Sequence, residues 1–125
     1  MRLTKKQREQ LFLKYDGKCA YCGCDLQKGW HADHIEAVER WNGKMYRPEN
    51  DVIENMNPSC PSCNIFKHSS CLETFRWQIE NCIKLLNNTT QYKFAKKFGL
   101  VEETQKKVKF YFEEYKEVDN GKENR

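Results

Sequence analysis

The segment Cys60-Pro61-Ser62-Cys63-Asn64-Ile65-Phe66-Lys67 contains half of each of two sites. Cys60 and Cys63 are separated by two residues, a spacing typical of one half of a zinc clamp. Asn64 and Lys67 follow at helical spacing, so an amide oxygen and a cation would share one helix face just beyond the clamp. The other half of each site must come from elsewhere in the chain.

A second cysteine pair, Cys19 and Cys22, lies near the N-terminus and is followed by Gly23. The two pairs form the pattern C-x2-C-x37-C-x2-C, which suits a tetrahedral four-thiolate zinc site. Cys24 could replace Cys22 as a ligand, but the two-residue spacer and the glycine favour Cys22. A zinc ion with four protein thiolates has no position for water, so we expect it to hold the fold and not to catalyse.

Composition restricts the class of protein. The chain has 125 residues, of which 38% are hydrophobic and 32% are charged. This is enough for one modest domain. The mean hydropathy is −0.95, and no apolar run is long enough to span a bilayer. Met1 to Lys6 leads into no apolar segment, so we expect no secretory signal and a cytoplasmic location.

The cysteine content indicates metal binding. The chain has seven cysteines, and in a cytoplasmic setting they favour metal binding over disulfides. We expect Cys71 and Cys82, which lie outside the two pairs, to be buried small apolar residues.

The net charge of +4 is unevenly distributed. Segments 2–18 and 93–109 each have six basic and two acidic residues, whereas segment 36–54 has five acidic and three basic residues. Two basic segments suit a polyanion such as DNA, although solvated helix faces explain them equally well. In the second segment lysines alternate with aromatic rings, and the candidate DNA contacts are Lys93, Lys96 and Lys97.

Hydrophobic periodicity and turn residues predict the elements of the first half of the chain. Thr4 should cap a helix that runs to about Lys14. Strands are predicted over 30–35 and 52–57, joined by a loop over 36–51, with Pro58 ending the second strand. A further helix should begin after Cys63 and run through Lys67.

The second half is predicted to be mainly helical. Residues 72–86 place five apolar side chains on one stripe, which we expect to pack in a core. A short helix over 91–98 should end at Gly99, and residues 108–112 alternate like a strand, although a helix fits nearly as well. We therefore expect an α+β fold with a zinc-stabilised core at 1–71, a helical extension packed on it at 72–118, and a disordered tail at 119–125.

These motifs together resemble the HNH endonuclease family in its version with two Cys-x-x-Cys knuckles. The resemblance rests on the two cysteine pairs, on Asp33-His34-Ile35, on Asn55, and on Asn64 and Lys67 after the second pair. It implies a ββα fold with a metal ion at its centre that hydrolyses DNA phosphodiester bonds. Stand-alone proteins of this kind resemble bacteriophage nucleases, and the oligomeric state, monomer or dimer, stays open.

The resemblance also implies roles for single residues. Asp33 and Asn64 would bind the catalytic metal, and their hard oxygen ligands suit Mg²⁺ or Mn²⁺. His34 would be the general base, because histidine ordinarily accepts a proton near neutral pH. Asn55 would steady the loop that carries His34, with Asn57 as a competitor, and Lys67 would neutralise charge at the scissile phosphate.

Some positions depart from the family pattern or leave alternatives open. Ala37 stands where a proline is usual, and the glycine-rich turn before Asn55 is reduced to Gly43. His31 and His68 could contact metal or phosphate, or could be ordinary surface residues. The rival hypothesis is a zinc-stabilised DNA-binding module without catalysis, which would bind DNA in a salt-sensitive way and cut nothing.

Overall fold

The chain folds as two units, which are described separately. The computed structural model describes residues 2–115, and the first unit consists of residues 2–72 and 109–115, whereas the second consists of Glu73–Val108. The predicted tail at 119–125 lies outside the described residues, and the predicted domain boundaries stay a prediction. Within residues 2–115, no helix has both the length and the apolar character needed to cross a membrane.

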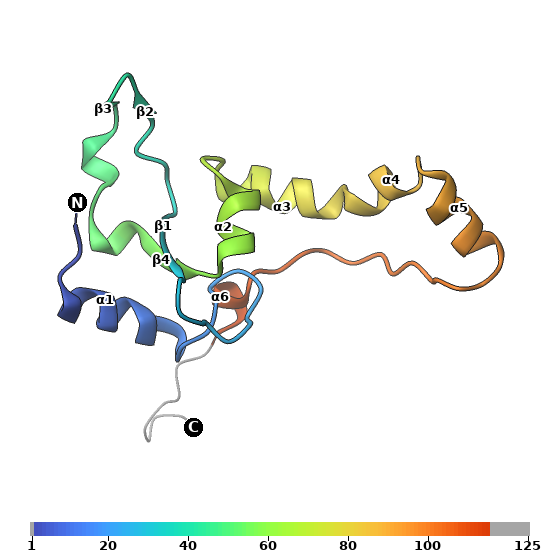
Figure 1. Ribbon diagram of the computed structural model, residues 1–125, viewed down its shortest axis with the longest axis horizontal. Coiled ribbons are helices and arrows are strands. Elements are labelled where there is room, and N and C mark those ends of the chain that lie inside the picture. The colour runs from blue at the N-terminus through green and yellow to red at the C-terminus, as the bar shows by residue number, and fades with distance from the viewer. Residues whose placement is uncertain (1, 116–125) are drawn as a thin grey trace. The chain divides into compact units, whose positions relative to one another are not determined.

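The first unit begins with helix α1, Lys5–Phe12 (Figure 1). Thr4 caps it as predicted. Its hydroxyl accepts from the Gln7 amide at 3.1 Å, and the Gln7 side chain accepts from the Thr4 amide at 2.9 Å. Leu11 is the buried residue of the helix. A 3-10 turn, Leu13–Tyr15, follows and ends at Asp16 and Gly17, both with positive φ.

Strands β1, His31–His34, and β4, Met56–Ser59, form a two-stranded antiparallel sheet (Figure 1). The first strand agrees with the prediction. The second was wrong, because residues Ile53–Asn55 form a 3-10 turn and the strand begins after them. Pro58 lies inside β4 opposite Ala32, and its carbonyl accepts from the Ala20 amide at 2.8 Å. Proline is tolerated there because each strand of a two-stranded sheet is an edge strand.

The segment between these strands was predicted to be a loop and contains a small hairpin. Strand β2, Arg40–Trp41, pairs with β3, Lys44–Met45, in antiparallel orientation. The turn residues Asn42 and Gly43 have φ of 51° and 75°. A two-residue hairpin turn requires this left-handed backbone, so the Asn-Gly pair is the signal that the loop prediction missed. A 3-10 turn, Pro48–Asn50, leads back toward β4.

Helix α2, Pro61–Lys67, starts inside the second cysteine knuckle, two residues before Cys63 and so earlier than predicted. Cys60 is its N-cap and Pro61 is its first residue. That position suits proline because the first amide of a helix has no helical partner. The knuckle thereby sets the start of the helix that carries Asn64 and Lys67.

The core of the first unit surrounds the first knuckle. Cys19, Ala20 and Tyr21 are buried, and the Tyr21 ring packs edge-on against Phe110 and Phe112 at 5.4 and 6.1 Å. The amides of Tyr111 and Phe112 donate to the carbonyls of Tyr21 and Ala20. Of the two alternatives for the segment that begins at residue 108, the strand was wrong and the helix was partly right: residues 101–110 form no helix or strand, and Tyr111–Glu114 form helix α6.

Helix α3, Leu72–Glu80, belongs to the second unit except for its first residue, and the unit also contains α4, Cys82–Leu86, and α5, Thr90–Lys97. The helix predicted over 72–86 is interrupted at Asn81. The short helix and the positive φ of Gly99 agree with the prediction. The expected apolar stripe was only partly right, because Phe75 is buried whereas Ile83 and Leu86 are exposed. The two remaining cysteines also differ from expectation, since Cys71 is exposed and Cys82 is half-buried.

Candidate active site

The four cysteines of the two knuckles converge on one point. The sulfur atoms of Cys19, Cys22, Cys60 and Cys63 all lie within 4.8 Å of one another. Cys22 Sγ and Cys60 Sγ are 3.9 Å apart. Four tetrahedral Zn–S bonds of about 2.3 Å require sulfur atoms at roughly this separation. The donor set and its spacing therefore fit a closed zinc site.

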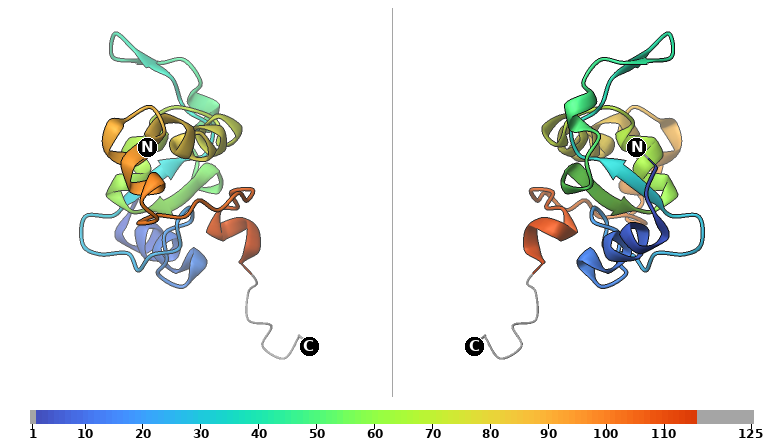
Figure 2. Two further views of the ribbon diagram at one scale, coloured as in Figure 1. Left: turned by 90° about the vertical axis from the view of Figure 1, so that its right-hand side faces the viewer. Right: turned by 90° about the vertical axis from the view of Figure 1, so that its left-hand side faces the viewer.

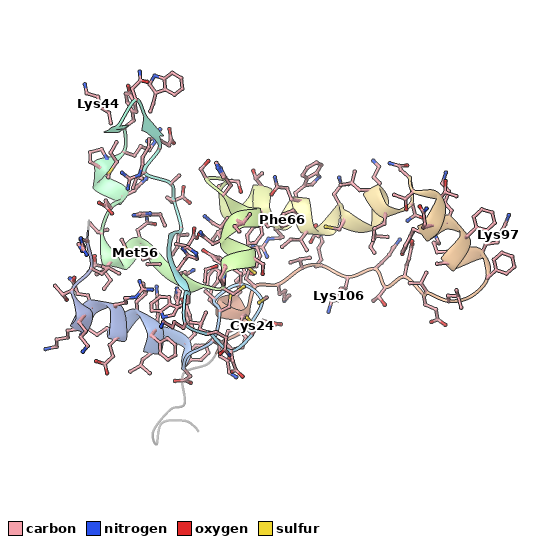
Figure 3. The ribbon with its side chains drawn as sticks, in the orientation of Figure 1. Cys24, Lys44, Met56, Phe66, Lys97 and Lys106 are labelled. Atoms are coloured by element: carbon pink, nitrogen blue, oxygen red, sulfur yellow. The ribbon has the colours of Figure 1, made fainter. Side chains whose placement is uncertain are left out.

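The backbone around this cluster favours thiolate sulfur. The amides of Tyr21 and Cys60 each donate to Cys19 Sγ at 3.4 Å. A hydrogen bond from the Cys63 thiol lowers the pKa of Cys19 to about 4 against the opposing effect of burial, and the neighbouring amides lower it further. A lowered pKa favours the thiolate form that binds metal. Cys24, labelled in Figure 3, lies outside the cluster, and burial raises its pKa to about 12. The structure thus selects Cys22 over Cys24.

Asp33 and Lys67 form a buried ion pair that also includes Tyr21. Asp33 Oδ2 accepts from the Tyr21 hydroxyl at 2.6 Å and lies 3.1 Å from Lys67 Nζ. Burial raises the pKa of Asp33, opposed by the Tyr21 hydrogen bond and by the Lys67 charge. Lys67 is 1% exposed, and its ammonium also donates to the His34 carbonyl at 2.9 Å. Protein atoms therefore already engage this ammonium, and its expected contact with a phosphate stays a prediction.

Lys67→Met is expected to lower the free energy of unfolding by about 3 kcal/mol, because it leaves the Asp33 carboxylate buried without its cation. Adding Asp33→Asn should restore part of that loss, since the double variant has no buried charge. Urea unfolding of the zinc-loaded proteins measures both values. A double variant less stable than Lys67→Met would show that the pair acts through packing and not through charge.

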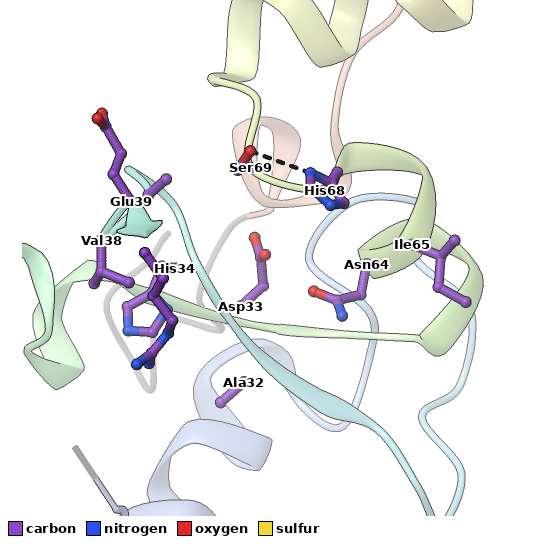
Figure 4. A pocket seen from close by; sticks show the side chains of 11 residues that line it. Ala32, Asp33, His34, Val38, Glu39, Asn64, Ile65, His68 and Ser69 are labelled. Atoms are coloured by element: carbon purple, nitrogen blue, oxygen red, sulfur yellow. Dashed lines mark hydrogen bonds between the residues drawn. The ribbon is translucent and has the colours of Figure 1, made fainter. Parts of the chain in front are cut away.

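A cleft of about 440 Å³ brings Asp33, His34 and Asn64 together (Figure 4). The Asp33 carboxyl group comes from β1 and the Asn64 amide comes from α2, and the two side chains border the same space. His34 and His68 also line the cleft. His31, on the same strand, is exposed and is not among the lining residues. The structure thus places three of the predicted site residues around one opening.

The His34 ring is held by a residue that the sequence did not single out. His34 Nε2 lies 2.8 Å from Asp51 Oδ1, and both side chains are mostly buried. Asp51 lies 17 residues further along the chain, in the segment predicted to be a loop. An acidic residue in a loop is ordinarily a solvated surface residue, so nothing in the sequence signals this contact. Because Asp51 engages Nε2, Nδ1 is the ring nitrogen left for another partner.

Asn55 ties together the two ends of the segment that joins β1 to β4. Its side-chain oxygen accepts from the Glu36 amide at 3.1 Å, and its nitrogen donates to the carbonyls of Glu36 and Asn50 at 2.8 and 2.7 Å. Its own carbonyl accepts from the Ile35 amide at 2.8 Å. These bonds are compatible with the loop-steadying role expected of Asn55, which stays a prediction.

Its competitor Asn57 lies in different surroundings. The Asn57 side chain is fully buried, with its oxygen facing Lys14 and Tyr15. It makes none of the loop contacts that Asn55 makes. Asn57 therefore belongs to the packing between the N-terminal segment and β4.

His68 has a backbone conformation that is unfavourable for any residue with a Cβ atom. Its φ of 53° and ψ of −132° follow directly after α2, and its Nδ1 lies 3.1 Å from Ser69 Oγ. Such strain costs about 1–3 kcal/mol and is often found at functional sites. Its predicted contact with phosphate is compatible with its place in the cleft and stays a prediction.

His68→Gly is expected to be more stable than His68→Ala by about 1–2 kcal/mol, because glycine alone relieves the backbone strain. This difference should appear even though glycine has the larger conformational entropy in the unfolded chain. Both variants lack the imidazole, so the comparison isolates the backbone. Urea unfolding of the zinc-loaded proteins decides the point, and an alanine variant as stable as the glycine variant would refute the strain.

The candidate DNA contacts Lys93, Lys96 and Lys97 belong to the second unit and have different surroundings. Lys96 Nζ is engaged by Asn87 Oδ1 at 2.9 Å and by Glu103 Oε2 at 3.1 Å. Lys97 Nζ lies 5.5 Å from the centre of the Phe94 ring. Lys93 and Lys97 are therefore better placed than Lys96 to offer charge to a ligand.

A two-stranded antiparallel sheet followed by a helix defines a small ββα domain, and its four-cysteine cluster is suited to a structural zinc ion. The model of the HNH endonuclease family matches residues 19–70, which contain the sheet, helix α2 and all four cysteines of the cluster. Residues 19–70, less than half of the chain, are therefore similar to an HNH endonuclease domain. Comparisons with curated proteins and with solved structures gave no match.

Proposed function

We propose that the protein is a metal-dependent HNH endonuclease that hydrolyses DNA phosphodiester bonds. The observation that carries this proposal is the shared cleft of Asp33, His34 and Asn64 within the region that the family model matches. A hard-oxygen ligand pair beside an uncoordinated histidine provides what hydrolysis of a phosphodiester needs: a site for a cation and an acceptor for the proton of water.

Asp33 and Asn64 would hold Mg²⁺ or Mn²⁺. Tyr21 and Lys67 occupy Asp33 Oδ2, so the other carboxylate oxygen is the one available to a cation. Each of these two residues would give one oxygen, which suits an ion that keeps several waters and shares the rest of its coordination with a phosphate. When bound, the cation would stabilise charge on the scissile phosphate and on the leaving 3′ oxygen.

His34 would accept the proton of the attacking water through Nδ1. Asp51 holds the ring at Nε2, which favours the tautomer with the proton on Nε2 and leaves the Nδ1 lone pair free. Asn55 fixes the backbone directly after His34 through its bonds to Ile35 and Glu36.

Lys67 would act mainly by positioning its neighbours. Its ammonium holds the Asp33 carboxylate and the His34 carbonyl at the same time. It also adds positive charge beside Asp33, which would favour the approach of a phosphate.

Zinc at the four cysteines would hold the knuckles and the start of α2 and take no part in the chemistry, since no coordination position stays open. The basic segments would add sequence-independent attraction to the DNA backbone, with Lys93 and Lys97 as the available lysines of α5. The two metals would thus have separate functions.

The test is nicking of supercoiled plasmid DNA by the zinc-loaded protein with and without Mg²⁺ or Mn²⁺. The proposal predicts conversion to open-circular DNA only when one of these ions is added. A protein that binds DNA in a salt-sensitive way but cuts none with either ion would instead be the non-catalytic DNA-binding module.

A further inference from the structure

The hairpin formed by residues 38–47 stands out from the β1–β4 sheet in both orientations of the ribbon (Figures 1 and 2). Its base is firmly attached to the unit. Val38 is buried, the Arg47 amide donates to the Val38 carbonyl at 2.8 Å, and the Tyr46 amide donates to the Glu39 carbonyl at 2.9 Å. An ion pair between Arg47 Nε and Glu39 Oε2 at 3.0 Å links the two sides of the hairpin base. The hairpin is therefore a defined projection on an anchored base.

The hairpin carries two large aromatic side chains in water. Trp41 is 65% exposed and Tyr46 is 57% exposed. Neither is needed to close the hairpin, because the left-handed Asn42-Gly43 turn already does so. Exposed aromatic rings on a projecting element are typical of a contact surface, since both residues combine an apolar face with a polar edge.

Positive charge is concentrated on the same element. From Arg40 to Tyr46 there are two basic residues and no acidic residue. Within residues 2–115, neither the Arg40 nor the Lys44 side chain has a hydrogen-bond or ion-pair partner, and Figure 3 shows Lys44 at the end of the hairpin. The acidic residue of the hairpin, Glu39, is paired with Arg47, and Asp51, which lies outside the hairpin, is paired with His34.

The two faces of the hairpin have different neighbours. Arg40 lies opposite Met45, and Trp41 lies opposite Lys44, so each pair shares one face of the ribbon. Arg40 is among the residues that line the cleft with Asp33 and His34. One face thus continues into the candidate active site, and the other presents a cation beside an aromatic ring.

We propose that this hairpin is a DNA-contacting arm that enters the major groove of the duplex beside the scissile phosphate. A two-stranded ribbon has the width that this groove admits, and cations on both faces would meet phosphates on both walls. Arg40 and Lys44 contact phosphates, and Trp41 and Tyr46 pack on sugars and base edges. The proposal rests on the proposed function only in that the partner is the same DNA.

The test measures affinity for a short labelled DNA duplex by fluorescence anisotropy, using full-length zinc-loaded protein without Mg²⁺ or Mn²⁺. Trp41→Ala should weaken binding about tenfold, as expected for the loss of one aromatic contact with DNA. The matched control is Trp77→Ala, which removes a similarly exposed tryptophan, at 62%, from the second unit and should bind like the wild type. Thermal unfolding confirms that each variant is folded.

A second variant, Arg40→Gln with Lys44→Gln, tests the charges. Its plot of log affinity against log salt concentration should be shallower by about 2, because two phosphate contacts are lost. Trp41→Ala binding equal to that of Trp77→Ala, or an unchanged salt slope, would overturn the proposal. So would a wild-type dimer that Trp41→Ala converts to a monomer with DNA affinity intact, since the hairpin would then contact a second copy.

The binding assay and the nicking assay separate this proposal from the proposed activity. Binding is measured without a cation that supports cleavage, so it does not depend on catalysis. A wild type that nicks no plasmid but loses affinity through Trp41→Ala would refute the activity and support the arm. A wild type that nicks plasmid while Trp41→Ala binds normally would support the activity and refute the arm.

Discussion

Cys60→Ser should leave the first unit unfolded under conditions in which the wild type is folded. Cys60 contributes a sulfur to the four-cysteine cluster and is at the same time the N-cap of α2. Binding of structural zinc contributes about 10–16 kcal/mol in small zinc domains, against a total stability of about 5–15 kcal/mol that is usual for a domain. The buried apolar core of this unit is small and is built around the first knuckle, so it depends on the cluster being closed. Removing one thiolate therefore removes most of the free energy that keeps this unit folded.

Zinc content and far-UV circular dichroism measured on the same sample would show this effect. The matched control is Cys24→Ser, which changes a cysteine beside the cluster that is not part of it. That control should keep one zinc ion per chain and the thermal unfolding curve of the wild type. A Cys60→Ser protein with full zinc content and unchanged unfolding would mean that another ligand, Cys24 included, completes the site.

His34→Ala should reduce the rate of plasmid nicking by about 10²–10⁴-fold, the usual contribution of a positioned general base. The fold should survive, because the ring lies at the cleft and its hydrogen-bond partner Asp51 is not part of the apolar core. Asp51→Asn should have a smaller effect than His34→Ala, since an amide can still hold the ring at Nε2. The order of these two effects tests the role assigned to each residue.

The control for this prediction is His31→Ala. His31 lies on the same strand three residues earlier, is exposed, and is not among the residues that line the cleft. Initial nicking rates at saturating Mg²⁺ compare the variants, and thermal unfolding shows whether each is folded. Nicking by His34→Ala at the rate of the wild type would exclude His34 as the base.

The metal cluster and much of the cleft could be predicted because their signals are local or come in fixed spacings. Two Cys-x-x-Cys pairs can converge only if the chain between them folds back, and the structure brings all four sulfurs together. The Thr4 cap and the positive φ of Gly99 follow from the chemistry of single residues. Asn55 was separated from Asn57 by its distance from Cys60, and its bonds to the loop agree with that choice.

The parts that sequence did not reveal depend on which residues meet across the fold. Spacing puts Asn64 and Lys67 on one helix face, but only the packing of α2 on β1 shows that Lys67 is buried against Asp33. Tyr21 contacts Asp33, which lies 12 residues away, and Asp51 contacts His34, which lies 17 residues away. Neither tyrosine nor aspartate signals such a contact in a sequence. Pro58 was predicted to end a strand because the sequence does not show that β4 has a single neighbour.

The net charge of segment 36–54 did not reveal the basic residues of the hairpin. Summed along the sequence, the segment is acidic, so charge alone gave no reason to expect a DNA contact there. In the structure, Glu39 is paired with Arg47 and Asp51 with His34, whereas within residues 2–115 the side chains of Arg40 and Lys44 have no such partner. A net charge per segment therefore does not reveal a surface whose charges are sorted by folding.

Zinc and the divalent cation of the cleft are expected to have separate functions, and one series of measurements separates them. Plasmid nicking and thermal unfolding are followed on the same zinc-loaded protein as Mg²⁺ is omitted, restored, and finally as zinc is removed. Omitting Mg²⁺ should abolish nicking with the unfolding temperature nearly unchanged, restoring it should recover nicking, and removing zinc should unfold the first unit. Nicking by the zinc-loaded protein without Mg²⁺, or a zinc-free protein that still folds, would refute this division of functions.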